Sequence, residues 1–309
     1  MADDSTAAIS KVQMDDGVQL NVKILGEDSM HTKPLLIALH GAPGLSTLAE
    51  PVESFGFLSD RFRVLVYDAR GSGDSDSIGP FDPDRWTKDI ENLRMWASAD
   101  KFVLAGGSYG AFVALDYAVR HGDRLCGLIL RAGWTVGKVG SMTAVANILK
   151  SKRVKPDAAR QVRLWSGTLH SDKDFEDAIM EILPIYSPPR VSSSDDQSES
   201  ADFKGTLIFH SKIQNTAFGE NMPRFDVRNQ LQDIKAPTLV LVGRHDYATP
   251  VSGSKEIADG IPNSRLEIFE NSGHSPSSDV PERSREVVSY FVKVRGLSKR
   301  SPKANGDAT

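Results

Sequence analysis

The sequence predicts an α/β fold, with a mostly parallel central sheet flanked by helices and a helical cap insertion. Short apolar runs bounded by glycine or proline recur along the chain, as is typical of strands buried on both faces of a parallel sheet. Helical patterns lie between several of these runs, which indicates repeated strand–helix units. The rhythm breaks over residues 134–233, where helical patterns occur and no convincing sheet strand does.

Each predicted element follows from its own pattern. An alternating stretch with a turn at Asp16-Gly17 (residues 8–26) predicts an antiparallel hairpin at the sheet edge. Helices are predicted over residues 86–97, 111–120 and 253–260. The apolar runs predict strands within residues 33–41, 61–71, 100–108, 124–133, 236–246 and 264–274.

The same patterns divide the chain into parts. Residues 1–133 and 234–296 are predicted to form the core, residues 134–233 the cap, and residues 297–309 a flexible polar tail. Within the cap, helices are expected over residues 141–150, 157–165 and 174–182. The polar, serine-rich stretch 187–202 is expected to be an exposed loop.

Charge and composition exclude several classes of protein. The 309 residues carry a formal net charge of −4, and their basic residues are scattered, so no nucleic-acid partner is expected. No apolar run reaches the roughly 18 residues of a membrane span, and the polar first residues lack the apolar core of a signal peptide. We therefore expect a cytoplasmic protein with no membrane partner.

The residues that bind metals and cofactors are not arranged as such sites require. The single cysteine, Cys126, cannot form an internal disulfide. No spacing typical of metal ligands, of a P-loop or of a dinucleotide-binding loop occurs. We expect a small-molecule substrate and no metal or cofactor, while the oligomeric state stays open.

A serine lies in the middle of three glycines at a junction between strand and helix. Residues 106–110 read GGSYG and fit the pattern G-x-S-x-G, with an apolar run before them and a helical pattern after them. A sharp turn of this kind exposes the Ser108 hydroxyl at the end of the sheet. The sequence therefore predicts Ser108 as a nucleophile.

A serine needs a base to accept its proton, and the base needs a partner that orients it. His274 lies in a loop just after the last predicted strand, and Asp246 follows the strand before it. A carboxylate after the preceding strand is the alternative in such folds, but Arg131 occupies that place. The order serine, aspartate, histidine is typical of α/β-hydrolases.

The oxyanion of an acyl-transfer intermediate needs two hydrogen-bond donors. We predict the backbone N–H of Tyr109, directly after the nucleophile, and that of Ala42 in the loop HGAPG (residues 40–44). Gly41 would let this loop pass close to a substrate. Further candidates for substrate binding, or for packing of the cap, are Trp134, Trp165, Phe218 and Phe225.

Taken together, these motifs resemble the α/β-hydrolase superfamily, and most closely its proline iminopeptidases. The resemblance covers about residues 10–295. HGAPG resembles that family's HGGPG, DARGSGDS (residues 68–75) resembles DQRGSGxS, and GGSYG resembles GGSWG. The stretches GRHDYATP (243–250) and SGHSP (272–276) resemble its acid and histidine loops. The resemblance implies the α/β-hydrolase fold and hydrolysis of an acyl bond.

One departure from that family bears on the substrate. Iminopeptidases bind a free amino terminus with acidic side chains, one of them in a Trp-Glu pair of the cap, whereas Ser166 follows Trp165 here. The sequence therefore favours an esterase-like, lactonase-like or amidase-like serine hydrolase of a small molecule. A true proline iminopeptidase is one alternative, and a small-molecule receptor or a lyase on the same fold is another.

Overall fold

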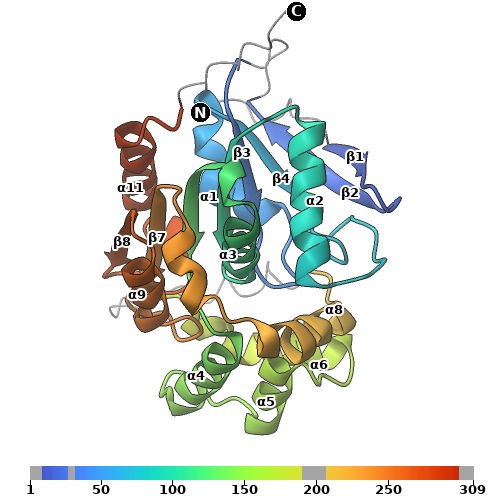
Figure 1. Cartoon of the computed structure of the whole chain (residues 1–309). Coiled ribbons are helices and arrows are strands. Elements are labelled where there is room, and N and C mark those ends of the chain that lie inside the picture. Colours follow the sequence, from blue (N-terminus) through green and yellow to red (C-terminus); the bar gives the residue numbers. More distant parts are fainter. Residues whose placement is uncertain (1–8, 27–31, 190–206, 299–309) are drawn as a thin grey trace, which may run out of the picture.

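Eight strands of the described chain form one sheet in the order β1-β2-β4-β3-β5-β6-β7-β8 (Figure 1). The computed structural model describes residues 9–26, 32–189 and 207–298. All pairs from β4 across to β8 are parallel, whereas β1 and β2 pair antiparallel at the edge. The predicted fold class, edge hairpin included, is confirmed. The strands are β1 (Ile9–Gln13), β2 (Gln19–Leu25), β3 (Leu35–Leu39), β4 (Arg63–Tyr67), β5 (Phe102–Gly107), β6 (Leu125–Arg131), β7 (Thr238–Gly243) and β8 (Ser264–Phe269).

Helices cover the sheet and one end of it. The α-helices are α1 (Ala49–Phe55), α2 (Pro83–Trp96), α3 (Tyr109–His121), α4 (Gly137–Lys150), α5 (Ala158–Ser166), α6 (Asp172–Ile182), α8 (Ser211–Thr216), α9 (Val251–Gly260), α10 (Pro276–Asp279) and α11 (Pro281–Val294). Short 3-10 segments are η2 (Gly56–Asp60), η3 (Gly122–Arg124), η4 (Leu183–Ile185), η7 (Met222–Arg224) and η8 (Arg228–Asp233), and η6 (Ala217–Asn221) is a π-helical turn. Within the described ranges, every helix is too short or too polar to span a lipid bilayer.

The inner strands β3 to β7 are largely apolar because both faces of the sheet are covered there. One face packs against α1 and α11, where Phe55 and Phe291 are buried. The other face packs against α2, α3 and α9, with Ile90, Leu115 and Ile257 fully buried. Burial on both sides explains why the strands show continuous apolar runs rather than alternation.

The inserted segment forms a separate group of helices. In Figure 1, α4, α5, α6 and α8 lie together beyond one end of the sheet, below α3 and α9. The predicted cap helices are present, each extended by a few residues or shifted by one. The boundaries of core and cap stay a prediction. Most of the expected loop 187–202 and of the tail 297–309 lies outside the described residues.

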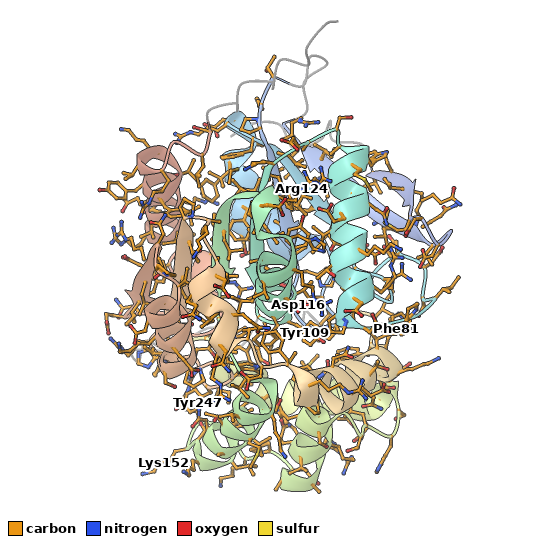
Figure 2. The ribbon with its side chains drawn as sticks, in the orientation of Figure 1. Phe81, Tyr109, Asp116, Arg124, Lys152 and Tyr247 are labelled. Carbon is orange, nitrogen blue, oxygen red and sulfur yellow. The ribbon has the colours of Figure 1, made fainter. Side chains whose placement is uncertain are left out.

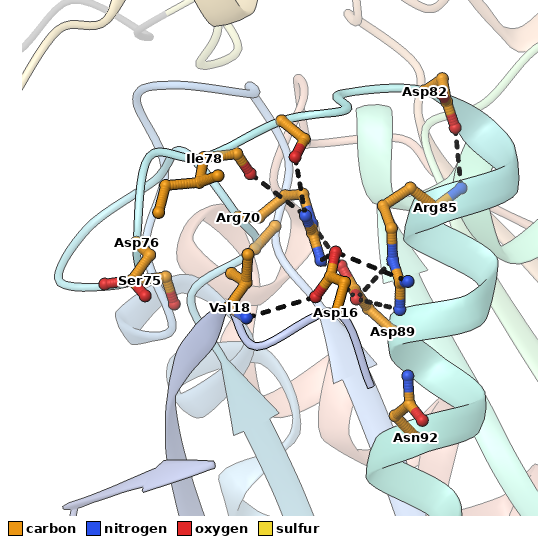
Figure 3. Close-up of polar contacts among 12 residues, drawn as sticks. Asp16, Val18, Arg70, Ser75, Asp76, Ile78, Asp82, Arg85, Asp89 and Asn92 are labelled. Atoms are coloured by element: carbon orange, nitrogen blue, oxygen red, sulfur yellow. Dashed lines mark hydrogen bonds and ion pairs between the residues drawn. The ribbon is translucent and has the colours of Figure 1, made fainter. Parts of the chain in front are cut away.

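A buried cluster of charges ties the edge hairpin to the rest of the fold (Figure 3). The guanidinium of Arg70, fully buried, donates from Nε and Nη2 to the two carboxylate oxygens of Asp89, at 2.8 and 2.9 Å. Arg85 donates to Asp89 as well, at 3.0 Å, and Asp16 of the hairpin turn lies 3.0 Å from Arg70. Because each buried charge has an opposite partner, the cluster fixes the loop after β4 without an unpaired charge.

Candidate active site

Ser108 lies on a strained turn between β5 and α3. Its backbone has φ 54° and ψ −121°, a conformation that a residue with a side chain rarely adopts and that costs about 1–3 kcal/mol. Glycines make the turn possible. A Cβ at Gly106 would lie 2.3 Å from the carbonyl oxygen of Gly110, and a Cβ at Gly110 would lie 2.5 Å from that of His40. The turn holds Ser108, half-buried, at the carboxyl end of the sheet.

Asp246 and His274 form a buried hydrogen-bonded pair. The Asp246 carboxylate accepts from His274 Nδ1 at 2.8 Å, and both side chains are less than a tenth exposed. The same carboxylate accepts the N–H groups of Ala248 and Thr249 and the Thr249 hydroxyl, at 2.9, 2.8 and 2.6 Å. Burial opposes ionisation, but the imidazole and these donors outweigh it and hold the pKa of Asp246 below its ordinary value. The carboxylate is therefore kept charged against the histidine.

A second contact holds His274 from the inserted segment. Tyr186, directly after η4, accepts the backbone N–H of His274 at 2.6 Å. Its ring meets the imidazole edge-on, with 4.9 Å between ring centroids. The inserted segment therefore contacts the histidine directly.

The loop that carries Ala42 is held at several points. His40 Nε2 accepts the backbone N–H of Ala69 at 2.9 Å, and Gly41 N donates to Glu50 Oε2 at 2.7 Å. Gly44 N donates to the Ser72 hydroxyl at 2.9 Å. The stretch after β4 thus supports the loop.

A small cavity opens beside Ser108. Its aromatic lining is packed ring on ring: Phe112 stacks on Trp134 with centroids 4.8 Å apart, and Phe218 meets Trp165 edge-on at 5.4 Å. Figure 2 shows Tyr109 at the boundary between α3 and the helices below it. The lining residues are Ala42, Pro43, Ser108, Tyr109, Phe112, Trp134, Leu164, Trp165, Phe175, Ile179, Tyr186, Gln214, Phe218, Ala248 and Thr249.

A model of the alpha/beta hydrolase fold matches residues 34–280. The chain belongs to the α/β-hydrolase fold family. It is 29% identical over 274 residues to a proline iminopeptidase of Pestalotiopsis fici, an alignment that covers 84% of this chain and 91% of that protein.

Solved structures agree with this assignment. A proline iminopeptidase of Mycobacterium smegmatis superposes with a TM-score of 0.69 at 22% identity, over 94% of this chain and 99% of that one. An esterase of Exiguobacterium antarcticum gives 0.67 at 22% identity, over 91% and 98%. The family and the curated relative make this chain a hydrolase that resembles the proline iminopeptidases.

Most of the residues predicted for the site come together in this hydrolase. Ser108, Tyr109 and Ala42 line the cavity, as do the aromatic candidates Trp134, Trp165 and Phe218. Asp246 and His274 are bonded behind it, where the hydroxyl of Thr249, a lining residue, lies 3.4 Å from His274 Nδ1.

Two of the candidate residues do not line this cavity. Gly41 does not line this cavity but a smaller neighbouring one, because its N–H turns toward Glu50. Phe225 is buried against Phe112, with centroids 5.7 Å apart, and takes part in packing, one of the two roles expected for it.

Several residues of the site have no motif that would reveal them. Gln214 and Phe112 line the cavity without belonging to any of the catalytic motifs. The sequence around Arg131 indicates only that no acid follows that strand, and no motif includes Glu50. Both turn out to contact the loops of the site.

Proposed function

We propose that this hydrolase cleaves an acyl bond of a small, uncharged molecule through an acyl-enzyme on Ser108. In this proposal His274 is the general base, and Asp246 orients the imidazole and stabilises its protonated form. The backbone N–H groups of Ala42 and Tyr109 bind the oxyanion. Tyr109 opens α3, so its N–H has no acceptor within that helix.

The chemistry proceeds in two acyl transfers. The Ser108 oxygen attacks the carbonyl carbon while His274 takes the hydroxyl proton. The tetrahedral intermediate collapses, the bond to the alcohol or amine breaks, and the imidazolium returns the proton to that leaving group. A water molecule, deprotonated by His274, then attacks the acyl-enzyme and releases the acid and free Ser108.

The lining of the cavity carries the proposal for the substrate class. None of the described residues that line it has a charged side chain, and Gln214 contributes an amide group. A charged group that enters such a site loses water without gaining an ionic partner. An apolar acyl group, by contrast, gains roughly 25 cal/mol for each Å² of apolar surface that it buries.

Acidic residues of the inserted segment point elsewhere in the described structure. Ser166, at the place of the iminopeptidase glutamate, is exposed, and its hydroxyl lies 2.9 Å from that of Thr168. Asp177 pairs with Lys173 on the solvent side of α6. Glu220 lines an open surface groove together with Ser166. These placements support a substrate without an ammonium group.

A proline iminopeptidase is the second candidate, since the curated relative of Pestalotiopsis fici carries that name. The two candidates differ in the charge of the substrate. An iminopeptidase prefers a free amine, whereas the proposed enzyme gains nothing from it. Loss of a charge-assisted contact in a dry site costs roughly 2–5 kcal/mol, so the two candidates are separable by kinetics.

The test compares kcat/KM for proline p-nitroanilide, its N-acetylated form and p-nitrophenyl butyrate. We expect hydrolysis of the butyrate and less than about a tenfold preference for the free amine, that is less than roughly 1.4 kcal/mol. The variant Gln214→Glu is the matched comparison, because it places a carboxylate in the lining and should raise that preference.

Two other outcomes of this test would contradict the proposal. A preference of wild type for the free amine by more than about tenfold would establish the iminopeptidase instead. No turnover of any acyl substrate would favour the receptor or lyase alternative.

A further inference from the structure

An ion pair between a buried arginine and a half-buried glutamate lies behind the candidate site. Arg131 ends β6 with 3% of its surface exposed, and its Nη2 contacts Glu50 Oε1, from the first turn of α1. The two residues are 81 positions apart in the chain. Neither lines the cavity beside Ser108.

The pair bonds to three of the segments that carry the proposed chemistry: the nucleophile turn, the histidine loop and the oxyanion loop. Arg131 Nη1 donates to the carbonyl oxygen of His274 at 2.7 Å, and the Arg131 carbonyl accepts Ser108 N–H at 2.8 Å. Glu50 Oε2 accepts Gly41 N–H at 2.7 Å, next to Ala42. The guanidinium also lies against the nucleophile turn, because a Cβ at Gly107 would fall 2.1 Å from Nη2.

An ion pair that is largely shielded from water does little for stability by itself, because the cost of removing charge from water offsets the attraction. Such a pair does fix the orientation of its hydrogen bonds, because a guanidinium presents its donors in a rigid plane. Here the directed bonds end on the backbone of the histidine loop and, through Glu50, on the backbone of the oxyanion loop.

We propose that Glu50 and Arg131 form a positioning pair that keeps His274 and the Ala42 loop in register with Ser108. The proposal rests on the proposed function, because it concerns the geometry of that acyl transfer. The pair touches no substrate, so it acts on kcat through the loops that it holds.

The charges around His274 provide a way to detect this role. Asp246 bonds to the ring, Tyr186 packs on it, and Asp279 accepts the neighbouring Gly273 N–H at 2.8 Å. The ion pair adds one charge of each sign on the backbone side of this loop, and the two charges offset each other while both are present. Removing one member leaves a single charge near the histidine.

The two single substitutions should therefore displace the pH profile in opposite directions. Glu50→Gln leaves the cation of Arg131, which disfavours a protonated base, so the acid limb of kcat/KM should move to lower pH. Arg131→Met leaves the carboxylate of Glu50, so the limb should move to higher pH. Each displacement should be roughly half a pH unit.

The experiment measures kcat, KM and the pH profile with p-nitrophenyl butyrate for wild type, both single variants and the double variant. We expect kcat to fall roughly 10- to 100-fold in each variant with KM nearly unchanged, because a small misplacement of reacting groups costs about that much. The double variant should regain the wild-type acid limb, since no net charge remains, but not the wild-type kcat.

A matched control removes half of another ion pair. Glu91 pairs with Arg94 at 2.9 Å on α2, away from the site, so Glu91→Gln should leave kcat and the acid limb unchanged. If Arg131→Met does not fold, Arg131→Lys replaces it. This variant keeps the charge, so it should lower kcat without moving the limb.

The inference is overturned if kcat stays within about twofold of wild type in the folded variants. It is also overturned if the acid limbs of Glu50→Gln and Arg131→Met move in the same direction. A loss confined to KM would also overturn it, because it would place the pair in substrate binding. These failures differ from failure of the proposed function, in which wild type itself would not hydrolyse the ester.

Discussion

Replacing Asp246 by asparagine removes one charge from the centre of the site while nearly preserving its shape. The carboxylate accepts four hydrogen bonds, from His274, from two backbone N–H groups and from the Thr249 hydroxyl. An amide offers only one acceptor oxygen, and its own donors would face at least one of these groups. A buried donor without an acceptor costs roughly 1–3 kcal/mol of stability, which a folded domain can tolerate.

The loss of activity should be far larger than the loss of stability. Without the anion, the imidazolium of His274 that forms during acyl transfer has no buried counter-charge, and the ring is no longer held in one tautomer. The same change in a serine-protease triad lowers kcat by about 10⁴-fold, which corresponds to roughly 5.4 kcal/mol of transition-state stabilisation. We expect a similar fall here with KM little changed, because Asp246 does not line the cavity.

The assay is steady-state hydrolysis of p-nitrophenyl butyrate, with the thermal unfolding midpoint measured on the same samples. Asp226→Asn is the matched control, because Asp226 is partly exposed and pairs with Arg228 at 2.6 Å outside the site. It should change kcat by less than about twofold. An Asp246 variant that is folded and retains more than about a tenth of wild-type kcat would refute the assignment of the acid.

Three further predictions concern stability and specificity. Asp89→Asn breaks the fully buried pair with Arg70 and should lower the free energy of unfolding in urea by roughly 3–5 kcal/mol; a loss below about 1 kcal/mol would contradict it. Hydrogen bonding from Arg163 holds the pKa of Asp174 well below its usual value. The ionised carboxylate therefore stabilises the folded state fully above about pH 4, and this stabilisation disappears as the pH falls further. Asp174→Asn should therefore flatten the decline of the unfolding midpoint below that pH, and an unchanged slope would count against the pairing. Trp165→Ala should raise the ratio of kcat/KM for octanoate over butyrate esters at least tenfold, at about 0.8 kcal/mol per CH₂ group; an unchanged ratio would remove Trp165 from the lining.

The sheet could be predicted because strands that are buried on both faces have continuous apolar sequences. All six runs contain an observed strand, β3 to β8. The turn at Ser108 could also be predicted from the sequence, because only glycine fits where β5 and α3 approach so closely. Local patterns suffice where the physical constraint is itself local.

Contacts between distant segments left no such trace. Arg131 and Glu50 lie in different elements, and nothing in their immediate sequence indicates that they meet. Tyr186 contacts His274 only because the inserted segment folds back onto the sheet edge. The exposure of Ser166 could not be predicted either. The sequence places it directly after Trp165, but which side of α5 faces solvent depends on how the helix packs.

The central claim, an acyl-enzyme on Ser108, is tested most directly by labelling with a fluorophosphonate probe and measuring the mass of the intact protein by mass spectrometry. This probe reacts with a serine that a base has activated. Wild type should gain the mass of one probe, located at Ser108 by peptide mapping. Ser108→Ala should stay folded, gain no mass and lose at least about a thousandfold in kcat. Labelling of the Ser108→Ala variant, or hydrolysis above about a tenth of the wild-type rate, would contradict the account.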